Sequence, residues 1–169
     1  NSNGDSVMSI LKVDTLQPAT GTRVSSAGHV VHSERQTTST DVNVTSTSYT
    51  DVWTVNYTPK LTTSTVMFQL STSIRLDRNG GYDNRGNIQI LHNGSSAYSI
   101  NYFGEYDYGN SGSWQKVSFS ETTEYSNTNG SQITWKLQVA QSSSSSATSV
   151  RFGEATSPCG SLLITEIAP

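Results

Sequence analysis

The sequence predicts an all-β fold, a two-sheet antiparallel sandwich of jelly-roll type. Apolar β-branched and aromatic residues alternate with polar residues along many short segments, which is the pattern of half-buried strands. Turn-forming pairs such as Asn93-Gly94 and Asn129-Gly130 separate these segments. No run of ten or more residues has a convincing helical period. Nine or ten short strands separated in this way indicate two packed sheets.

The strand signal is densest in residues 49–76, around which the rest of the chain is arranged. The segment D-V-W-T-V-N-Y alternates, and Val66, Phe68 and Leu70 resume the alternation after Pro59. The connection P-K-L-T-T-S makes this pair either a β-hairpin or a crossover between two sheets. In chain order, the expected strands of the sandwich are residues 29–36, 40–44, 49–57, 65–76, 87–92, 97–103, 113–121, 132–141, 149–152 and 161–167.

The N-terminal part of the chain is expected to be separate from the sandwich. Residues 9–16, S-I-L-K-V-D-T-L, alternate as a strand, but a linker containing Pro and Gly follows them. An isolated strand exposes unpaired backbone groups, so this one is expected to pair outside its own domain. We therefore expect an N-terminal strand and linker in residues 1–27 and the sandwich in residues 28–169.

Composition and charge exclude several functional classes. Ser and Thr account for 51 of the 169 residues, whereas only 14% are charged, which favours a β-rich surface of extracellular type. The net charge is −3, and the Lys and Arg residues are scattered along the sequence, so they do not predict the basic patch that binds nucleic acid. No apolar run is long enough to span a membrane, so no membrane insertion is expected. Cys159 stands alone and is expected to be a small buried residue, which suits assembly in a reducing cytoplasm.

Loop carboxylates offer weak candidates for catalysis and for metal binding. Asp77 with Asp83, or Glu105 with Asp107, would be an acid/base pair for glycoside hydrolysis, but no catalytic motif accompanies them. Asp77, Asn79 and Asp83 carry the oxygen ligands that Ca²⁺ prefers, but the spacing lacks the terminal Glu of an EF-hand. Solvated turn residues explain both patterns, so we expect no enzyme, no metal and no cofactor.

Aromatic and polar side chains concentrate around the loop 104–112. Exposed Tyr residues beside Asp and Asn form a surface that stacks on sugar rings and bonds to their hydroxyl groups. The alternative is that the loop packs on its own subunit or on a neighbour, with Phe103 and Trp114 in the core. The candidate receptor-binding residues are Tyr102, Tyr106, Asp107, Tyr108, Asn110 and Trp114.

Four segments carry a resemblance to a known family. These are S-I-L-K-V-D-T-L-Q-P-A-T-G, G-H-V-V-H, S-T-S-Y-T-D-V-W-T-V-N-Y-T-P-K-L-T-T-S-T-V and the ending S-L-L-I-T-E-I-A-P. Together they resemble the distal domain of tail fibres of tailed bacteriophages, similar to those of marine and cyanobacterial phages. The resemblance implies a homotrimeric virion appendage that is assembled in the host cytoplasm and joined to other tail proteins. It also implies an N-terminal strand that interlocks the subunits and a head that meets the host surface.

Three functions are compatible with this resemblance. The first is multivalent, non-catalytic adhesion to a glycan or protein receptor on the host cell. The second is a structural connector, cap or decoration protein of the virion with no host ligand. The third is cleavage of surface polysaccharide. The sequence has neither the solenoid repeat nor the catalytic motif that would support this function. We expect the first.

Overall fold

The computed structural model describes residues 27–78, 84–105, 114–142, 147–153 and 159–169. The expected N-terminal strand at residues 9–16 lies outside the described residues, and so do four of the candidate binding residues, namely Tyr106, Asp107, Tyr108 and Asn110. None of the elements in the described ranges is a helix that could cross a membrane.

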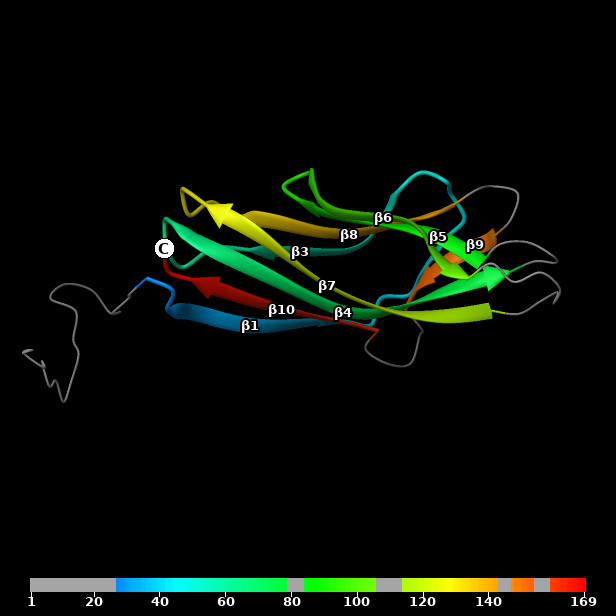
Figure 1. Ribbon diagram of the computed structural model, residues 1–169, viewed down its shortest axis with the longest axis horizontal. Helices are drawn as coiled ribbons and strands as arrows, with labels where there is room; N and C mark the ends of the chain where they lie inside the picture. Colours follow the sequence, from blue (N-terminus) through cyan, green and yellow to red (C-terminus); the bar gives the residue numbers. More distant parts are fainter. Residues whose placement is uncertain (1–26, 79–83, 106–113, 143–146, 154–158) are drawn as a thin grey trace, which may run out of the picture.

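The described residues form all ten strands that the sequence predicts for the sandwich (Figure 1). They are β1 (Val30–Thr38), β2 (Val42–Val44), β3 (Thr50–Tyr57), β4 (Ser64–Arg78), β5 (Asn84–His92), β6 (Ser95–Glu105), β7 (Trp114–Asn127), β8 (Ile133–Gln141), β9 (Ala147–Phe152) and β10 (Gly160–Ile167).

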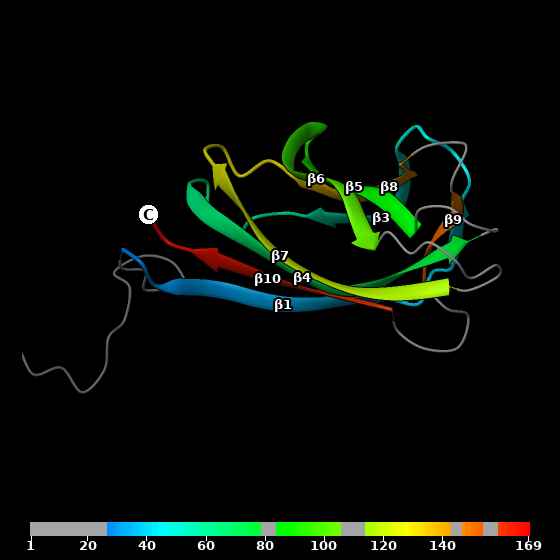
Figure 2. The ribbon, with the colours of Figure 1, turned by 45° about the vertical axis from the view of Figure 1, so that its right-hand side comes forward.

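The strands form two antiparallel sheets that lie one above the other (Figure 2). Sheet A contains β1, β2, β4, β7, β9 and β10, and sheet B has the order β3-β8-β5-β6. In sheet A the long strand β4 pairs with β7 on one side. On its other side it pairs first with β10 and then with β9, so these two act as one interrupted strand. β1 and β2 continue this arrangement beyond β10 and β9.

The topology is that of a jelly roll, as predicted. Counting the interrupted strands once, sheet A has four strand positions and sheet B has four. Among the consecutive strands β2 to β9, only β5 and β6 are neighbours in one sheet, and all the other connections pass between the sheets. A two-residue turn joins β5 to β6, and its residues Asn93 and Gly94 have φ angles of 50° and 83°. These positive angles are those of the hairpin turn that Asn-Gly favours.

The core lies between the sheets and follows directly from the alternation in the sequence. Inward-facing residues of β4 and β8 are almost fully buried, whereas their neighbours in the sequence face outward. The rings of Trp53 and Trp135 meet edge to face with their centroids 5.6 Å apart. Phe68 is also buried in this core cluster, where its ring contacts Tyr57 and His92.

The connection after Pro59 is a crossover, because β3 belongs to sheet B and β4 to sheet A. A carboxylate without exposed surface, that of Glu166 on β10, holds the crossover in place. It accepts hydrogen bonds from the backbone N–H of Lys60 at 2.7 Å and Leu61 at 2.9 Å, and from the Tyr57 hydroxyl at 2.7 Å. Burial acts to raise the pKa of Glu166, but these donors outweigh it and the pKa lies below its usual value.

The two ends of the sandwich differ in what they present. At one end the described chain begins and finishes, where Gly28 and Ala168 are joined by a backbone hydrogen bond of 3.0 Å. At the other end, on the right in Figure 1, β4, β6 and β8 finish and β5, β7 and β9 begin. We call this the loop end, and the two described candidate residues, Tyr102 and Trp114, belong to it.

Candidate binding surface at the loop end

Both described candidate residues are exposed aromatic side chains. Tyr102 near the end of β6 is 62% exposed, and Trp114 at the start of β7 is 54% exposed. Phe103 is buried, as the core alternative predicted. The same alternative is wrong for Trp114, because the register of β7 against β4 places it opposite Asp77 on the outer face of sheet A.

The structure does not bring Tyr102 and Trp114 together. Tyr102 lies on the outer face of sheet B, because its neighbour Phe103 points into the core, whereas Trp114 lies on the outer face of sheet A. Two separate surfaces therefore replace the single aromatic cluster that the sequence suggested.

A β-bulge holds Tyr102 in place. Gly86 pairs with Phe103 and Ile88 with Ile100, so Asn87 alone faces two residues of β6, one of which is Tyr102. Tyr102 has a φ of 60°, which is uncommon for a residue with a large side chain. Its backbone N–H donates to Asn87 Oδ1 at 3.1 Å, and this bond supports the unusual conformation.

Arg85 packs beside the exposed ring. Its guanidinium carbon lies 5.9 Å from the centroid of the Tyr102 ring, within the range of a cation–π contact. Bulges commonly redirect a side chain next to a functional site. The bulge and the Asn87 bond fix the backbone of Tyr102, and its ring is presented to solvent beside Arg85.

Amide side chains surround Tyr102 on the outer face of sheet B. Gln89 on β5 is in register with Gln138 on β8, and Asn87 lies two residues from Gln89 on the same face. Tyr49 precedes β3, and its hydroxyl group donates to Asn101 Oδ1 on β6 at 3.4 Å, which links the two outermost strands of the sheet. We call this surface the amide face; it consists of Tyr49, Asn87, Gln89, Asn101, Tyr102 and Gln138.

An ion pair borders the amide face on the β3 side. Asp51 accepts hydrogen bonds from Lys136 Nζ at 2.5 Å and from Gln138 Nε2 at 2.6 Å. The hydrogen bond from Lys136 is the main reason that the pKa of Asp51 lies below its usual value. Asp51 therefore stays charged at neutral pH and orients the Gln138 amide.

Sequence reasoning missed most of the amide face. A signal was present, because the segments N-I-Q-I and K-L-Q-V place amides at the outward positions of two expected strands. The sequence did not show that these two strands are neighbours, which is what brings Gln89 beside Gln138.

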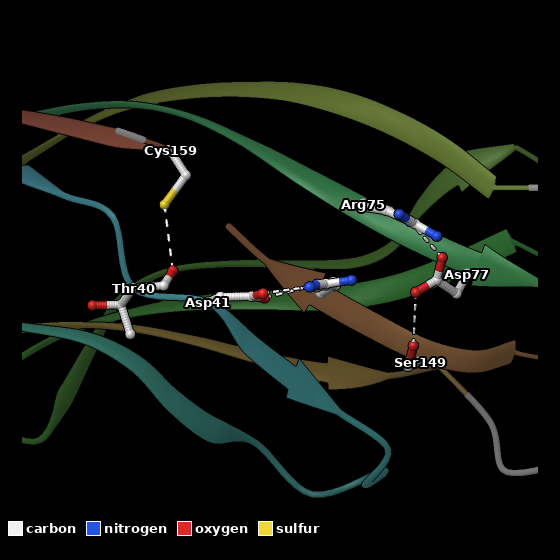
Figure 3. Close-up of polar contacts among 7 residues, drawn as sticks. Thr40, Asp41, Arg75, Asp77, Ser149 and Cys159 are labelled. Carbon is white, nitrogen blue, oxygen red and sulfur yellow. Dashed lines mark hydrogen bonds and ion pairs between the residues drawn. The ribbon is translucent and has the colours of Figure 1, made fainter. Parts of the chain in front are cut away.

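Trp114 has a different environment on sheet A. The guanidinium carbon of Arg75 lies 5.0 Å from the centroid of the Trp114 ring. Asp77 holds this guanidinium group with an Nε–Oδ1 distance of 2.5 Å and also accepts a hydrogen bond of 3.0 Å from Ser149 (Figure 3). Strand register places Lys116 and Arg151 on either side of Arg75, so three cationic residues form a row across β7, β4 and β9.

The described carboxylates of this region act in structural ion pairs. Asp77 is bound by Arg75 and Ser149, and Asp41 pairs with Arg151 through two hydrogen bonds, which keep the pKa of Asp41 below its usual value. Asn79 and Asp83, the other members of the considered oxygen-ligand set, lie outside the described residues. Within the described ranges, no group of three or more His, Cys, Asp or Glu side chains could hold a metal ion.

Comparisons with known proteins give distant similarities only. No protein-family model and no curated protein matches this sequence. Among solved structures, the chain is similar to dimeric latent PorU from Porphyromonas gingivalis, at 11% identity and a TM-score of 0.42, with 89% of this chain and 14% of that chain covered. It is also similar to infectious bursal disease virus strain Gx, at 12% identity and a TM-score of 0.37, with 93% of this chain and 40% of that chain covered. A third similarity is to the T13 particle of the same virus, at 12% identity and a TM-score of 0.32, with 93% and 39% covered. This chain thus spans less than half the length of each of these three proteins, and at these identities and TM-scores the matches assign it neither a family nor an activity.

Proposed function

We propose that this chain is a trimeric appendage protein of a tailed-phage virion, and that it attaches the particle to a host-surface glycan without cleaving it. The sequence resemblance to tail-fibre distal domains supports the virion role and the association with other tail proteins. The jelly-roll fold is compatible with it, because viral coat domains and lectins both use this architecture.

The amide face is the observation that supports glycan binding. A sugar presents hydroxyl groups, which need both donors and acceptors, and each Asn or Gln amide supplies both. A sugar ring also presents an apolar face that packs on an exposed aromatic ring. Tyr102 offers such an exposed ring next to the amides of Asn87 and Asn101. Because the backbone is already fixed by the bulge and Tyr has only two side-chain torsions, binding would cost little conformational entropy.

A trimer would carry three such faces. Individual sites of modest affinity then give strong attachment, because the second and third contacts form at high effective concentration. Adhesion of this kind needs no buried acid/base pair, and Asp41, Asp51 and Asp77 are bound in ion pairs.

The test is adsorption of the intact chain to host cells, together with binding to a glycan array. We expect Tyr102→Ala to weaken single-site affinity by about tenfold through loss of one aromatic contact, and Tyr102→Phe to retain most of it. Trp114→Ala is the matched control, because it removes an aromatic side chain of similar exposure from the opposite face. Loss of binding in the control with unchanged binding in Tyr102→Ala would exclude the amide face.

Light scattering on the same chain tests the rest of the proposal. A trimer is expected, and removal of residues 1–17 should weaken it. A monomer would contradict the appendage role. Trimers that do not bind host cells but co-purify with a tail or capsid protein would support the connector function instead of adhesion.

A further inference from the structure

Sheet A has a shallow depression on its outer face, where the paired strands β9 and β10 are interrupted. Its volume is about 460 Å³, and its lining includes Arg35, Thr37, Ser71, Ser73, Ser161 and Cys159. This surface lies on the opposite side of the sandwich from the amide face.

The lining of the depression is rich in hydroxyl groups because of strand register. Thr37 on β1 is opposite Ser161 on β10, and Ser161 is opposite Ser71 on β4, which is opposite Ser120 on β7. Four hydroxyl side chains therefore form a row across four strands of sheet A. Hydroxyl groups both donate and accept hydrogen bonds, so they suit a ligand with several oxygen atoms.

Arg35 is the charged side chain of the lining. Its Nε donates to Ser161 Oγ at 2.7 Å, which orients the guanidinium group over the row of hydroxyls. This bond uses Nε, and no carboxylate in the described part of the chain forms an ion pair with Arg35. Among the described residues the two terminal nitrogen atoms have no hydrogen-bond partner, so they are available for the fork geometry that binds carboxylate, sulfate or phosphate.

The described acidic groups next to the depression, Cys159 and Asp41, do not oppose an anion. Burial raises the pKa of the Cys159 thiol, which donates to the Thr38 carbonyl at 3.3 Å, so this group is neutral at pH 7. Asp41, which acts on the thiol from one side, is neutralised by its two hydrogen bonds to Arg151 (Figure 3). Beyond the depression lies the cationic row of Lys116, Arg75 and Arg151. Arg35 lies level with Gln69 of β4, six residues before Arg75, so the cationic row is about 20 Å away along the strands.

We propose that this depression is a second binding site, which takes an anionic group of a polysaccharide, a sulfate or a carboxylate, on Arg35 and the hydroxyl row. The inference depends on the proposed function only for the source of the ligand, because the host surface would supply the polysaccharide.

Cys159 provides a direct readout of occupancy, because it is the single cysteine of the chain and lines the depression. The experiment follows alkylation of the intact chain by neutral iodoacetamide, with and without a sulfated dextran oligomer, and measures affinity by calorimetry. The sulfated oligomer should slow the alkylation, and the unsulfated oligomer of equal length should not. Arg35→Gln should weaken binding of the sulfated oligomer by about tenfold, as expected for one charge-assisted contact.

Lys60→Gln is the control, because it removes one positive charge from an exposed side chain in the crossover loop. Equal binding of both oligomers, or unchanged affinity in Arg35→Gln, would overturn the proposal. Inorganic sulfate that protects Cys159 as well as the oligomer does, at equal sulfate concentration, would overturn the polysaccharide as the ligand. Tyr102→Ala should leave the protection intact, so failure of the glycan-adhesion proposal would remain distinguishable from failure of this one.

Discussion

Replacing Glu166 with Gln tests whether a buried carboxylate holds the crossover between the two sheets. The carboxylate accepts hydrogen bonds from the backbone N–H groups of Lys60 and Leu61 and from the Tyr57 hydroxyl, and a side-chain hydrogen bond with Ser64 also lowers its pKa. Gln keeps the shape of the side chain, but it exchanges one acceptor oxygen for an NH₂ donor. With its oxygen in the place of Oε2 it still accepts from Tyr57 and Lys60, whereas its NH₂ group meets the Leu61 N–H.

The expected cost follows from these contacts. A buried donor left without an acceptor costs about 1–3 kcal/mol, and the hydrogen bonds from Tyr57 and Lys60 each lose about 1 kcal/mol when their acceptor becomes neutral. Glu166→Gln should therefore lower the free energy of unfolding by about 3–5 kcal/mol, a large share of the ~5–15 kcal/mol of a typical domain. Tyr57→Phe, which leaves both backbone donors satisfied, should lower it by only about 2 kcal/mol.

Urea denaturation followed by tryptophan fluorescence measures this difference. With a slope of about 2 kcal/mol per molar urea, the midpoint of Glu166→Gln should fall by about 1.5–2.5 M. Because the folded pKa of Glu166 lies below its usual value, its contribution is present above about pH 4.5 and is lost as the pH falls through the folded pKa. The difference in the free energy of unfolding between wild type and Glu166→Gln should therefore become smaller at acidic pH. A difference in the free energy of unfolding below about 1 kcal/mol at pH 7 would contradict this prediction. So would a difference that stays constant down to pH 3.

Two further predictions concern the core and the support of Tyr102. Burial lowers the pKa of His92, whose Nε2 lies 3.0 Å from Thr123 Oγ1, so the unfolded chain takes up this proton first. The free energy of unfolding should thus fall by up to about 1.4 kcal/mol per pH unit as the pH drops below about 6.5. Urea titrations at pH 7.5 and 5.5 should show a smaller fall for His92→Gln than for the wild type. An equal fall in both proteins would contradict this prediction. A Cβ at Gly86 would lie 2.7 Å from the Phe103 ring, so Gly86→Ala should lower the free energy of unfolding by about 1–3 kcal/mol. Phe103→Leu in the same chain should recover part of that loss, and strictly additive effects of the two substitutions would show that the clash is absent.

Much of the fold could be predicted from the sequence, because each strand of this sandwich has one buried face and therefore alternates. Strand β7 shows where the method fails. The alternation predicts a strand over 113–121, but β7 runs from Trp114 to Asn127. The segment T-T-E-Y-S-N has little apolar pattern of its own, and it is a strand because β4 pairs with it as far as Ser64. Long-range pairing of this kind leaves no local signal.

The candidate site was predicted less well than the fold. The sequence showed that Tyr102 and Trp114 flank one loop, and both are exposed. It did not show that β6 and β7 belong to different sheets, which separates the two rings. Nor did it show the bulge opposite Asn87, because a bulge depends on the partner strand as well as on its own residues. The site could not be predicted in full because the sequence does not show which strands are neighbours in a sheet.

The interrupted strand of sheet A makes the chain unequally tolerant of insertions and deletions. All the residues of β4 from Ser64 to Asp77 are in register with β7 without a shift, and inward and outward positions alternate along them. A single residue gained or lost inside β4 would turn the apolar residues of one half outward. Between β9 and β10 the pairing with β4 is already interrupted. A change of length there therefore leaves the inward and outward positions of both strands unchanged. Natural variation in length among related sandwiches should therefore accumulate beside the Arg35 depression and be rare in β4.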